Sequence, residues 1–400
     1  MRNVRKRRGL ALLLSLLLAA IASLNAAPFT AVAAEMPNVL EEGSLDVQAK
    51  SAVLMDVNTG TVLYEQNAHE ELPPASVTKV MTMLLALEAA ERGQFSLEDT
   101  ATISERAASM GGSQMYMEPG EVHTVEELFQ GASICSANDA CVALAELTKG
   151  TEELFVEAMN QRAKELGMDH SHFVNTNGLP AEGHVSCAHD IALMSRELLK
   201  HPEPREWFST WQTDIQIGLP GKEKPFTLTN TNKMIRSYSG ANGIKTGYTQ
   251  DAGYCLSASA TRGDLTLIAV IMGADSSKIR FSEASRLLDY GFANYEAVKV
   301  AEKGQNMGRA FVERGIPETV EAVTKEEISV LVPKGQGTTV TPQVILNETL
   351  KAPLEKGAVV GELKVYQGET ILGTWPLTAA EPVEQAGWLE MVRRMIHKFF

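Results

Sequence analysis

The order of strand-like and helical segments in the first part of the chain is the feature that most constrains its fold. Strand-like runs occur early, at residues 52–55 and 61–64, and again late, at residues 254–260 and 265–272. Apolar and β-branched residues bounded by turn residues are typical of strands. The stretch between them, above all residues 98–167, is mostly helical in pattern. This order predicts a sheet assembled from both ends of the region, with a helical subdomain inserted between its strands.

The pattern changes after residue 296. Short β-like runs, split by Gly and Pro, follow one another at residues 328–332, 340–346, 359–365 and 370–372. Such regular short runs are typical of an all-β fold. We therefore expect a small all-β domain over residues 297–380.

The end of the chain, residues 386–400, is a basic amphipathic segment. Its apolar side chains recur at helical spacing and its basic side chains lie among them. The apolar stripe contains Trp388, Leu389, Val392, Met395, Ile396 and Phe399, and the basic residues are Arg393, Arg394, His397 and Lys398. The segment is too short and too charged to span a bilayer, so we expect a helix that anchors the protein in the membrane interface. The alternative is a terminal helix docked on the β domain.

The first 34 residues have the layout of an export signal. A basic segment at residues 2–8 precedes an apolar run at residues 10–24, and small residues follow up to residue 34. Cleavage after Ala33 fits the A-x-A pattern of secretory signal peptides, and Ala27 and Ala34 are alternative cleavage sites. A retained N-terminal anchor is the alternative, although the apolar run is short of the roughly 20 residues that a span needs. We expect an exported protein that works on the outer face of the cytoplasmic membrane.

Charge and cysteine content exclude several other classes of protein. The formal net charge is -14 and the pI is about 5.2, whereas nucleic-acid-binding surfaces are normally basic. The four cysteines, Cys135, Cys141, Cys187 and Cys255, lack the spacing of a metal site. We expect free, mostly buried thiols, although an exported protein could pair them. With no metal-ligand cluster and no phosphate-binding glycine loop in the sequence, neither a metal nor a cofactor is expected.

The first motif with chemical content is Ser76-Val77-Thr78-Lys79. Residues three apart on a helix share one face, so Lys79 can reach the hydroxyl of Ser76. A serine hydroxyl becomes a nucleophile when a base takes its proton, and a lysine does this if burial lowers its pKa. Taken alone, the pattern is common by chance and is more typical of an ordinary solvated lysine on a helix.

Two further polar motifs follow in otherwise apolar surroundings. Ser136-Ala137-Asn138 lies within a predicted amphipathic helical stretch, where polar side chains need partners. Lys245-Thr246-Gly247 leads into the late strand pair, where its ammonium and hydroxyl suit a carboxylate and the glycine leaves room for a ligand at the strand edge. A helix cap and a basic turn are the alternatives for these motifs in isolation.

The order and spacing of the three motifs decide between these interpretations. S-x-N follows S-x-x-K by about 60 residues, and K-T-G follows about 110 residues later. With its surroundings, this set resembles the low-molecular-weight penicillin-binding proteins, the D-alanyl-D-alanine carboxypeptidases of peptidase family S11. The matching stretches are PASVTK at 74–79, ICSANDA at 134–140, FVNTNGL at 173–179, GIKTGYT at 243–249, and His184 with AHD at 188–190. The likeness covers residues 45–292, which we take as the catalytic domain.

The resemblance implies both a fold and an activity. The fold is the α/β (α+β) penicillin-binding/β-lactamase-like transpeptidase fold, an antiparallel sheet with a helical subdomain, followed here by the small all-β domain. The activity is removal of the terminal D-alanine from peptidoglycan stem peptides through an acyl-enzyme, without a cofactor. β-Lactam antibiotics are expected to act as covalent inhibitors.

The resemblance also implies a role for each motif residue. Ser76 is the acylated nucleophile, Lys79 is its base, and Ser136 with Lys245 passes a proton to the leaving D-alanine. The residues implied in substrate binding are Asn138 for an amide, Lys245 and Thr246 for the terminal carboxylate, Gly247 for access to the strand edge, and Tyr248, whose N–H joins that of Ser76 in an oxyanion hole.

The chain departs from the family pattern at Thr231 and at Cys187, where many relatives have threonine. Three other functional interpretations of its motifs also have to be considered. Some relatives carry a carboxylate-binding arginine where this chain has Thr231; Arg236 or Arg262 could replace it. A β-lactamase would need a carboxylate that activates the deacylating water, and Glu182 is the only acidic residue in the loop at 175–184. A catalytically silent penicillin-binding scaffold and an endopeptidase would carry the same three motifs.

Overall fold

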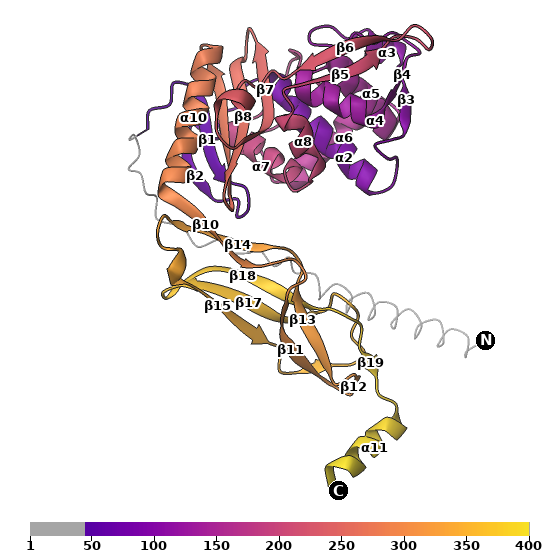
Figure 1. The fold of residues 1–400 in the computed structure, drawn as a ribbon, viewed down its shortest axis with the longest axis vertical. Coiled ribbons are helices and arrows are strands. Elements are labelled where there is room, and N and C mark those ends of the chain that lie inside the picture. The colour runs from indigo at the N-terminus through magenta and orange to yellow at the C-terminus, as the bar shows by residue number, and fades with distance from the viewer. Residues whose placement is uncertain (1–44, 400) are drawn as a thin grey trace, which may run out of the picture. The chain divides into compact units, whose positions relative to one another are not determined.

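The computed structural model describes residues 45–399, which divide into two compact units. Within the described range, the larger unit comprises residues 45–305 and 326–340, and the smaller comprises residues 306–325 and 341–399. Figure 1 shows the elements of each unit. The predicted signal peptide, residues 1–34, lies outside the described residues.

A five-stranded antiparallel sheet forms the centre of the larger unit (Figure 1). Its order is β2 (Val62–Gln66), β1 (Ser51–Asp56), β9 (Leu265–Ala274), β8 (Gly253–Arg262) and β7 (Ala241–Thr249). The early strand β1 pairs with the late strand β9, with Val53 opposite Val270. The expected sheet built from both ends of the region is therefore confirmed.

Both faces of this sheet are buried, because successive residues of a strand point to opposite sides. Val53 and Met55 pack into one apolar core with α2 (Lys79–Glu91) and α7 (Ala188–Leu198). Ala52 and Leu54 pack into a second core with α10 (Ser277–Asn294). Ser276 caps α10, and its hydroxyl accepts a hydrogen bond from the N–H of Ile279 at 3.2 Å. The central strands are therefore held rigidly between two helical layers.

The helical subdomain lies between β2 and β7 in the chain. Its other helical elements are η1 (Ala75–Thr78), α3 (Glu105–Ala108), α4 (Val125–Gln130), η2 (Gly131–Cys135), α5 (Asn138–Lys149), α6 (Glu152–Glu165), α8 (Glu203–Ser209) and α9 (Met234–Ser237). Two small ribbons accompany them: β3 (Thr100–Thr102) with β4 (Val122–Thr124), and β5 (Gln212–Ile217) with β6 (Lys224–Thr229).

The predicted continuous helical stretch around Ser136 is wrong in one respect. The chain leaves α4 through the π-helical turn η2, reaches Ser136 in the left-handed conformation with φ 66°, and starts α5 at Asn138. A non-glycine residue in this conformation costs free energy that the surrounding structure must offset, and such residues cluster at functional sites. The second motif therefore lies at a break between two helices.

The smaller unit is built on one sheet with the order β15-β17-β18-β13-β11-β16. Its strands are β11 (Asn306–Glu313), β12 (Gly315–Ile316), β13 (Thr319–Thr324), β15 (Val340–Leu346), β16 (Leu350–Lys351), β17 (Val359–Gln367), β18 (Thr370–Ala379) and β19 (Glu384–Gln385). The ribbon of β10 (Tyr295–Ala301) and β14 (Ile328–Pro333), with the short turn η3 (Gly337–Thr339), belongs to the larger unit.

The terminal helix α11 (Trp388–Phe399) touches the smaller unit through its polar side. The guanidinium of Arg394 donates to the carbonyl of Gly315 at 2.9 Å and pairs with Glu318 at 2.9 Å. Apolar side chains of the stripe up to Ile396 are exposed: Trp388 is 72% accessible and Met395 is 56% accessible. Within residues 45–399, no helix is both long and apolar enough to cross a membrane.

Candidate active site

Ser76 and Lys79 form a hydrogen-bonded pair at the start of α2. Ser76 lies in the 3-10 turn η1, in which residues three apart eclipse one another. The ammonium of Lys79 donates to the hydroxyl of Ser76 at 2.9 Å and to the carbonyl of Asn177 at 2.7 Å. Burial lowers the pKa of Lys79 from its ordinary 10.5 to about 8. The amine can therefore accept the proton of Ser76 near neutral pH.

The second motif lies close to this pair. Cys135, the neighbour of Ser136, interacts electrostatically with both Lys79 and Lys245. Ser136 and Asn138 are both buried. The side-chain amide of Asn138 donates to the carbonyl of Gly111 at 2.6 Å, so the loop at 111–113 sets its orientation. The structure thus brings all three motifs into one region of the larger unit.

The third motif forms the inner part of the edge strand β7. A Cβ on Gly247 would lie 3.1 Å from the backbone nitrogen of Ser76 and 3.0 Å from the carbonyl oxygen of Pro74. Glycine at this position lets the strand approach η1 closely. The side chain of Tyr248 is exposed and packs on Tyr254, with ring centroids 4.4 Å apart.

The ammonium of Lys245 lies where its surroundings disfavour a positive charge. It is fully buried, and burial followed by the charge of Lys79 lowers its pKa well below the ordinary value. Two neighbouring buried ammonium groups oppose each other's protonation. The charge of Lys245 is therefore conditional, and an anion bound beside it would favour the protonated form.

Comparison with known proteins agrees with this geometry. The family model for D-alanyl-D-alanine carboxypeptidase, peptidase S11, matches residues 35–276, and the model for the C-terminal domain of penicillin-binding protein 5 matches residues 295–385. The chain belongs to the peptidase S11 family of D-alanyl-D-alanine carboxypeptidases. It is a serine-type D-Ala-D-Ala carboxypeptidase and a penicillin-binding protein with the predicted fold.

Individual relatives cover most of the carboxypeptidase. It is 41% identical to the D-alanyl-D-alanine carboxypeptidase DacF of Bacillus subtilis, over 87% of this chain and 89% of that protein. It is 36% identical to DacC of Escherichia coli, over 93% of each. The crystal structure of penicillin-binding protein 5 from Haemophilus influenzae superposes with a TM-score of 0.70 and 30% identity, covering 85% of this chain and 99% of that one.

One further solved structure of a relative contains a drug. A penicillin-binding protein from Listeria monocytogenes, determined in the ampicillin-bound form, has a TM-score of 0.55 and 32% identity to the carboxypeptidase. The match covers 62% of this chain and 98% of that one.

Two supports of the carboxypeptidase site were given no role in the sequence analysis, although the first lies in the matching stretch at 173–179. The first is the turn of Asn175, Asn177 and Gly178, which carries the carbonyl that binds Lys79. A Cβ on Gly178, which has φ +85°, would lie 1.8 Å from the carbonyl oxygen of Ala75, so only glycine allows this contact. The Asn-x-Asn-Gly composition was a turn signal that could have indicated it.

The second support is Arg280 on α10. Its buried guanidinium donates to the carbonyl of Gly247 at 2.9 Å and to that of Cys255 at 3.2 Å. Arg280 therefore links β7 to β8 from the face of the sheet that α10 covers. An arginine on the inner face of an amphipathic helix was the available signal, but its partners could not be read from the sequence.

Thr231, the position at which the family resemblance implies an arginine in some relatives, contacts the third motif. Thr231 accepts a hydrogen bond from the hydroxyl of Thr246 at 2.7 Å. The guanidinium of Arg236 lies over the ring of Trp211 at 5.1 Å, and that of Arg262 lies over Phe292 at 4.5 Å. Both guanidinium groups are thus engaged with aromatic rings, whereas Thr231 is in direct contact with the third motif.

The four cysteines are free thiols, as predicted, and all but the half-buried Cys135 are buried. Burial raises the pKa of Cys135 to about 11, which keeps this thiol protonated and inert at neutral pH. Among the described residues, no cluster of His, Cys, Asp and Glu has the arrangement of a metal site.

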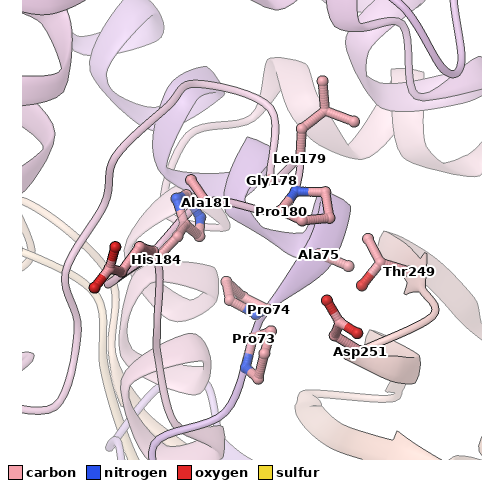
Figure 2. Close-up of a pocket in the computed structure, with 11 residues that line it drawn as sticks. Pro73, Pro74, Ala75, Gly178, Leu179, Pro180, Ala181, His184, Thr249 and Asp251 are labelled. Atoms are coloured by element: carbon pink, nitrogen blue, oxygen red, sulfur yellow. The ribbon is translucent and has the colours of Figure 1, made fainter.

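A cavity of about 390 Å³ opens beside the carboxypeptidase's reactive region (Figure 2). One wall is formed by residues 73–75, immediately before Ser76. The others are formed by the loop at 178–184 and by Thr249 and Asp251 at the end of β7. Its size lies in the range of roughly 300–1,000 Å³ that is usual for ligand pockets.

Proposed function

We propose that this carboxypeptidase removes the terminal D-alanine of peptidoglycan stem peptides by acylation of Ser76, with Lys79 as the general base. The contact between the Lys79 ammonium and the Ser76 hydroxyl, 2.9 Å, is the observation that carries this proposal. Loss of a proton from Lys79, whose pKa is about 8, leaves an amine placed to take the serine proton during attack on the scissile carbonyl. Water then hydrolyses the acyl-enzyme.

The other motif residues bind the substrate and the developing charge. The N–H groups of Ser76 and Tyr248 form the oxyanion hole, and the close approach of Gly247 to Ser76 supports this assignment. Asn138 holds a substrate amide. Lys245 and Thr246 bind the terminal carboxylate, and Thr231 orients the hydroxyl of Thr246.

The leaving D-alanine receives its proton through Ser136 and Lys245. The arriving carboxylate raises the pKa of Lys245, because an opposite charge favours the ammonium form. Protonation of Lys245 in turn favours the neutral form of Lys79. Substrate binding thus favours the neutral amine of Lys79, the form that can accept the proton of Ser76.

β-Lactams acylate the same serine. The ampicillin-bound structure of the Listeria monocytogenes relative supports this proposal. A fluorescent penicillin is therefore a direct reporter of a functional Ser76.

The enzyme works outside the cytoplasm, held at the membrane surface by α11. The export signal predicted over residues 1–34 supports its exit from the cytoplasm. The exposed apolar stripe of α11 supports interfacial binding, because water-exposed Trp388, Leu389 and Ile396 gain free energy when they enter lipid.

The decisive experiment is incubation of the purified enzyme with a pentapeptide that ends in D-Ala-D-Ala, followed by mass spectrometry. We expect loss of one alanine residue. Ser76→Ala should abolish both D-alanine release and labelling by fluorescent penicillin, while circular dichroism stays unchanged. Full penicillin labelling of the variant would contradict the assignment of the nucleophile, and labelling without release by the unmodified enzyme would indicate a catalytically silent scaffold.

A further inference from the structure

We propose that His184 is a positioning residue for the base Lys79. Its imidazole holds the turn at 174–178 against the start of α2, and this keeps the carbonyl of Asn177 at the ammonium group. The inference rests on the proposed function, since Lys79 is the base only in that mechanism. His184 acts through Lys79, so its loss should change the reactivity of Ser76 and not only the stability of the fold.

The imidazole of His184 bridges the turn and the first motif. Its Nδ1 accepts a hydrogen bond from the N–H of Val174 at 3.0 Å, so its Nε2 carries the proton and donates to the hydroxyl of Thr78 at 2.8 Å. Burial, with a smaller contribution from the nearby His172, lowers the pKa of His184 to about 4. The ring therefore stays neutral at neutral pH and keeps the one donor and one acceptor that the bridge needs.

The backbone beside His184 is fixed to two other segments. Val185 exchanges two backbone hydrogen bonds with His172, at 2.9 and 3.0 Å. Ser186 exchanges two with Leu72, at 2.8 and 3.0 Å, and Leu72 lies shortly before the nucleophile in the chain. The imidazole is thus anchored to the segment that leads into the first motif. His184 also lines the cavity of Figure 2.

Three buried side chains at the start of α2 hold the turn in place. Thr78 binds it through the imidazole. Lys79 donates to the carbonyl of Asn177 at 2.7 Å. The hydroxyl of Thr82 donates to the carbonyl of Thr176 at 2.6 Å. Because residues four apart share one face of a helix, Thr78 and Thr82 lie on either side of the contact that Lys79 makes.

The carbonyl of Asn177 orients the ammonium of Lys79. Of the three N–H donors of an ammonium group, one binds the hydroxyl of Ser76 and one binds this carbonyl. If the turn moves away, the ammonium can rotate away from Ser76. It also loses an acceptor that favours its charged form, so its pKa should fall further. Loss of the bridge should therefore affect both the rate of acylation and its pH dependence.

His184→Phe tests this inference, because it keeps an aromatic ring and removes both hydrogen bonds. We expect the second-order rate of Ser76 labelling by fluorescent penicillin to fall at least about tenfold, at a temperature where circular dichroism shows a folded protein. The midpoint of the labelling rate against pH should also move below about 8, the pKa of Lys79 in the unmodified enzyme. A purely structural role would leave this midpoint in place.

A rescue variant and a matched control connect the effect to the bridge. His184→Gln supplies one donor and one acceptor on a neutral side chain, so it should restore labelling to within about threefold of the unmodified enzyme. His172→Gln changes an exposed histidine of the same loop, whose Nδ1 contacts the carbonyl of Gly183 at 2.9 Å. The control should label at the unmodified rate with the unmodified midpoint.

Thr78→Val tests the other end of the bridge and replaces His184→Phe if that variant does not fold. Removal of the hydroxyl should lower the labelling rate and shift the midpoint in the same direction. Residues that act through one contact have non-additive effects. The double variant should therefore be little slower than the slower single variant.

The outcomes separate this inference from the proposed function. A normal rate and midpoint in His184→Phe and Thr78→Val would overturn it, and so would a slower rate with an unchanged midpoint, because the change would then not act on Lys79. Fully additive effects in the double variant would also contradict the bridge. A labelling rate of the unmodified enzyme that does not depend on pH would instead contradict the proposed base, and with it this inference.

Discussion

Lys79 shows how a single residue makes the proposed reaction possible at neutral pH. An ordinary lysine with a pKa of 10.5 is neutral in only about one molecule in a thousand at pH 7.5. Burial in this site lowers the pKa to about 8, so roughly a quarter of the molecules carry the neutral amine at that pH. Acylation therefore requires no histidine or metal-bound base in the proposed mechanism.

The pH dependence of acylation follows from this pKa. The base must lose its proton, so the rate of penicillin labelling of Ser76 should rise with pH and level off above about 8. Stopped-flow or timed labelling with fluorescent penicillin between pH 5.5 and pH 9.5 measures it, in steps of about half a unit. Lys79→Arg is the control, because arginine stays protonated. A labelling rate that does not change with pH, or near-normal labelling of Lys79→Arg, would show that a group other than Lys79 is the general base.

Lys245 leads to a prediction about the substrate's terminus. Its ammonium is buried and gains its favourable partner only when a carboxylate binds beside it. Loss of one partner of a buried, hydrogen-bonded charge pair costs about 3–5 kcal/mol. A peptide with an amidated C-terminus should therefore react more than about 100-fold more slowly than the free acid. Measurement of kcat/KM for the two peptides checks this. Equal values would show that Lys245 does not distinguish a charged C-terminal carboxylate from a neutral amide.

At the scale of elements, β7 is held in place from both sides. Gly247 lets the strand contact η1 on the side of Ser76, and Arg280 on α10 binds the carbonyl of Gly247 from the other side. The strand is at the edge of the sheet, with β8 as its neighbour. Arg280 thus acts as a positioning residue, since it touches the strand and not the proposed substrate.

Removal of the Arg280 guanidinium should loosen β7. Arg280→Met leaves two buried carbonyl groups without their charged donor, which costs about 1–3 kcal/mol of folding stability. We expect kcat/KM for the D-Ala-D-Ala peptide to fall at least about tenfold at a temperature where the variant is folded. Lys278→Met, an exposed substitution on the same helix, is the matched control. Thermal unfolding and peptide kinetics together test this, and a destabilised variant with unchanged kinetics would limit Arg280 to a structural role.

At the scale of the whole molecule, the chain combines a catalytic unit, a β unit and a terminal amphipathic helix. Arg394 ties the polar side of α11 to the β unit, while Trp388, Leu389 and Ile396 remain exposed. This pattern is the reverse of a helix docked through its apolar face. In the proposed anchoring, the enzyme samples the wall peptides close to the membrane.

Deletion of residues 386–400 should release the mature protein from anionic vesicles and from the membrane fraction. The apolar stripe supplies buried area, and each basic residue adds about 1 kcal/mol near an anionic surface. Activity on small peptides should stay unchanged, which distinguishes release from unfolding. Met395→Asp, which places a charge on the exposed stripe, should weaken vesicle binding in the same direction. Full membrane retention of the truncated mature protein would contradict the anchor.

Much of this protein was predictable because its information is local. The S-x-x-K, S-x-N and K-T-G motifs identified the chemistry, and the strand-like runs at both ends of the catalytic region predicted the mixed sheet that β1 and β9 form. The pairing of Ser76 with Lys79 could also be predicted, since it depends on residues one helical turn apart. Features of this kind can be recognised in the amino-acid sequence, because they depend on residues that are close together in the chain.

The remaining features depend on segments that meet only in the folded chain. The break at Ser136, the contact of Asn177 with Lys79, and the support of Gly247 by Arg280 are set by packing on both faces of the central sheet. Burial also lowers the pKa of Lys245, and the fold places Asp251 beside the cavity next to Ala75. The sequence by itself determined which chemical groups are present. Tertiary structure decided their distances and their desolvation, because both depend on residues that are far apart in the chain.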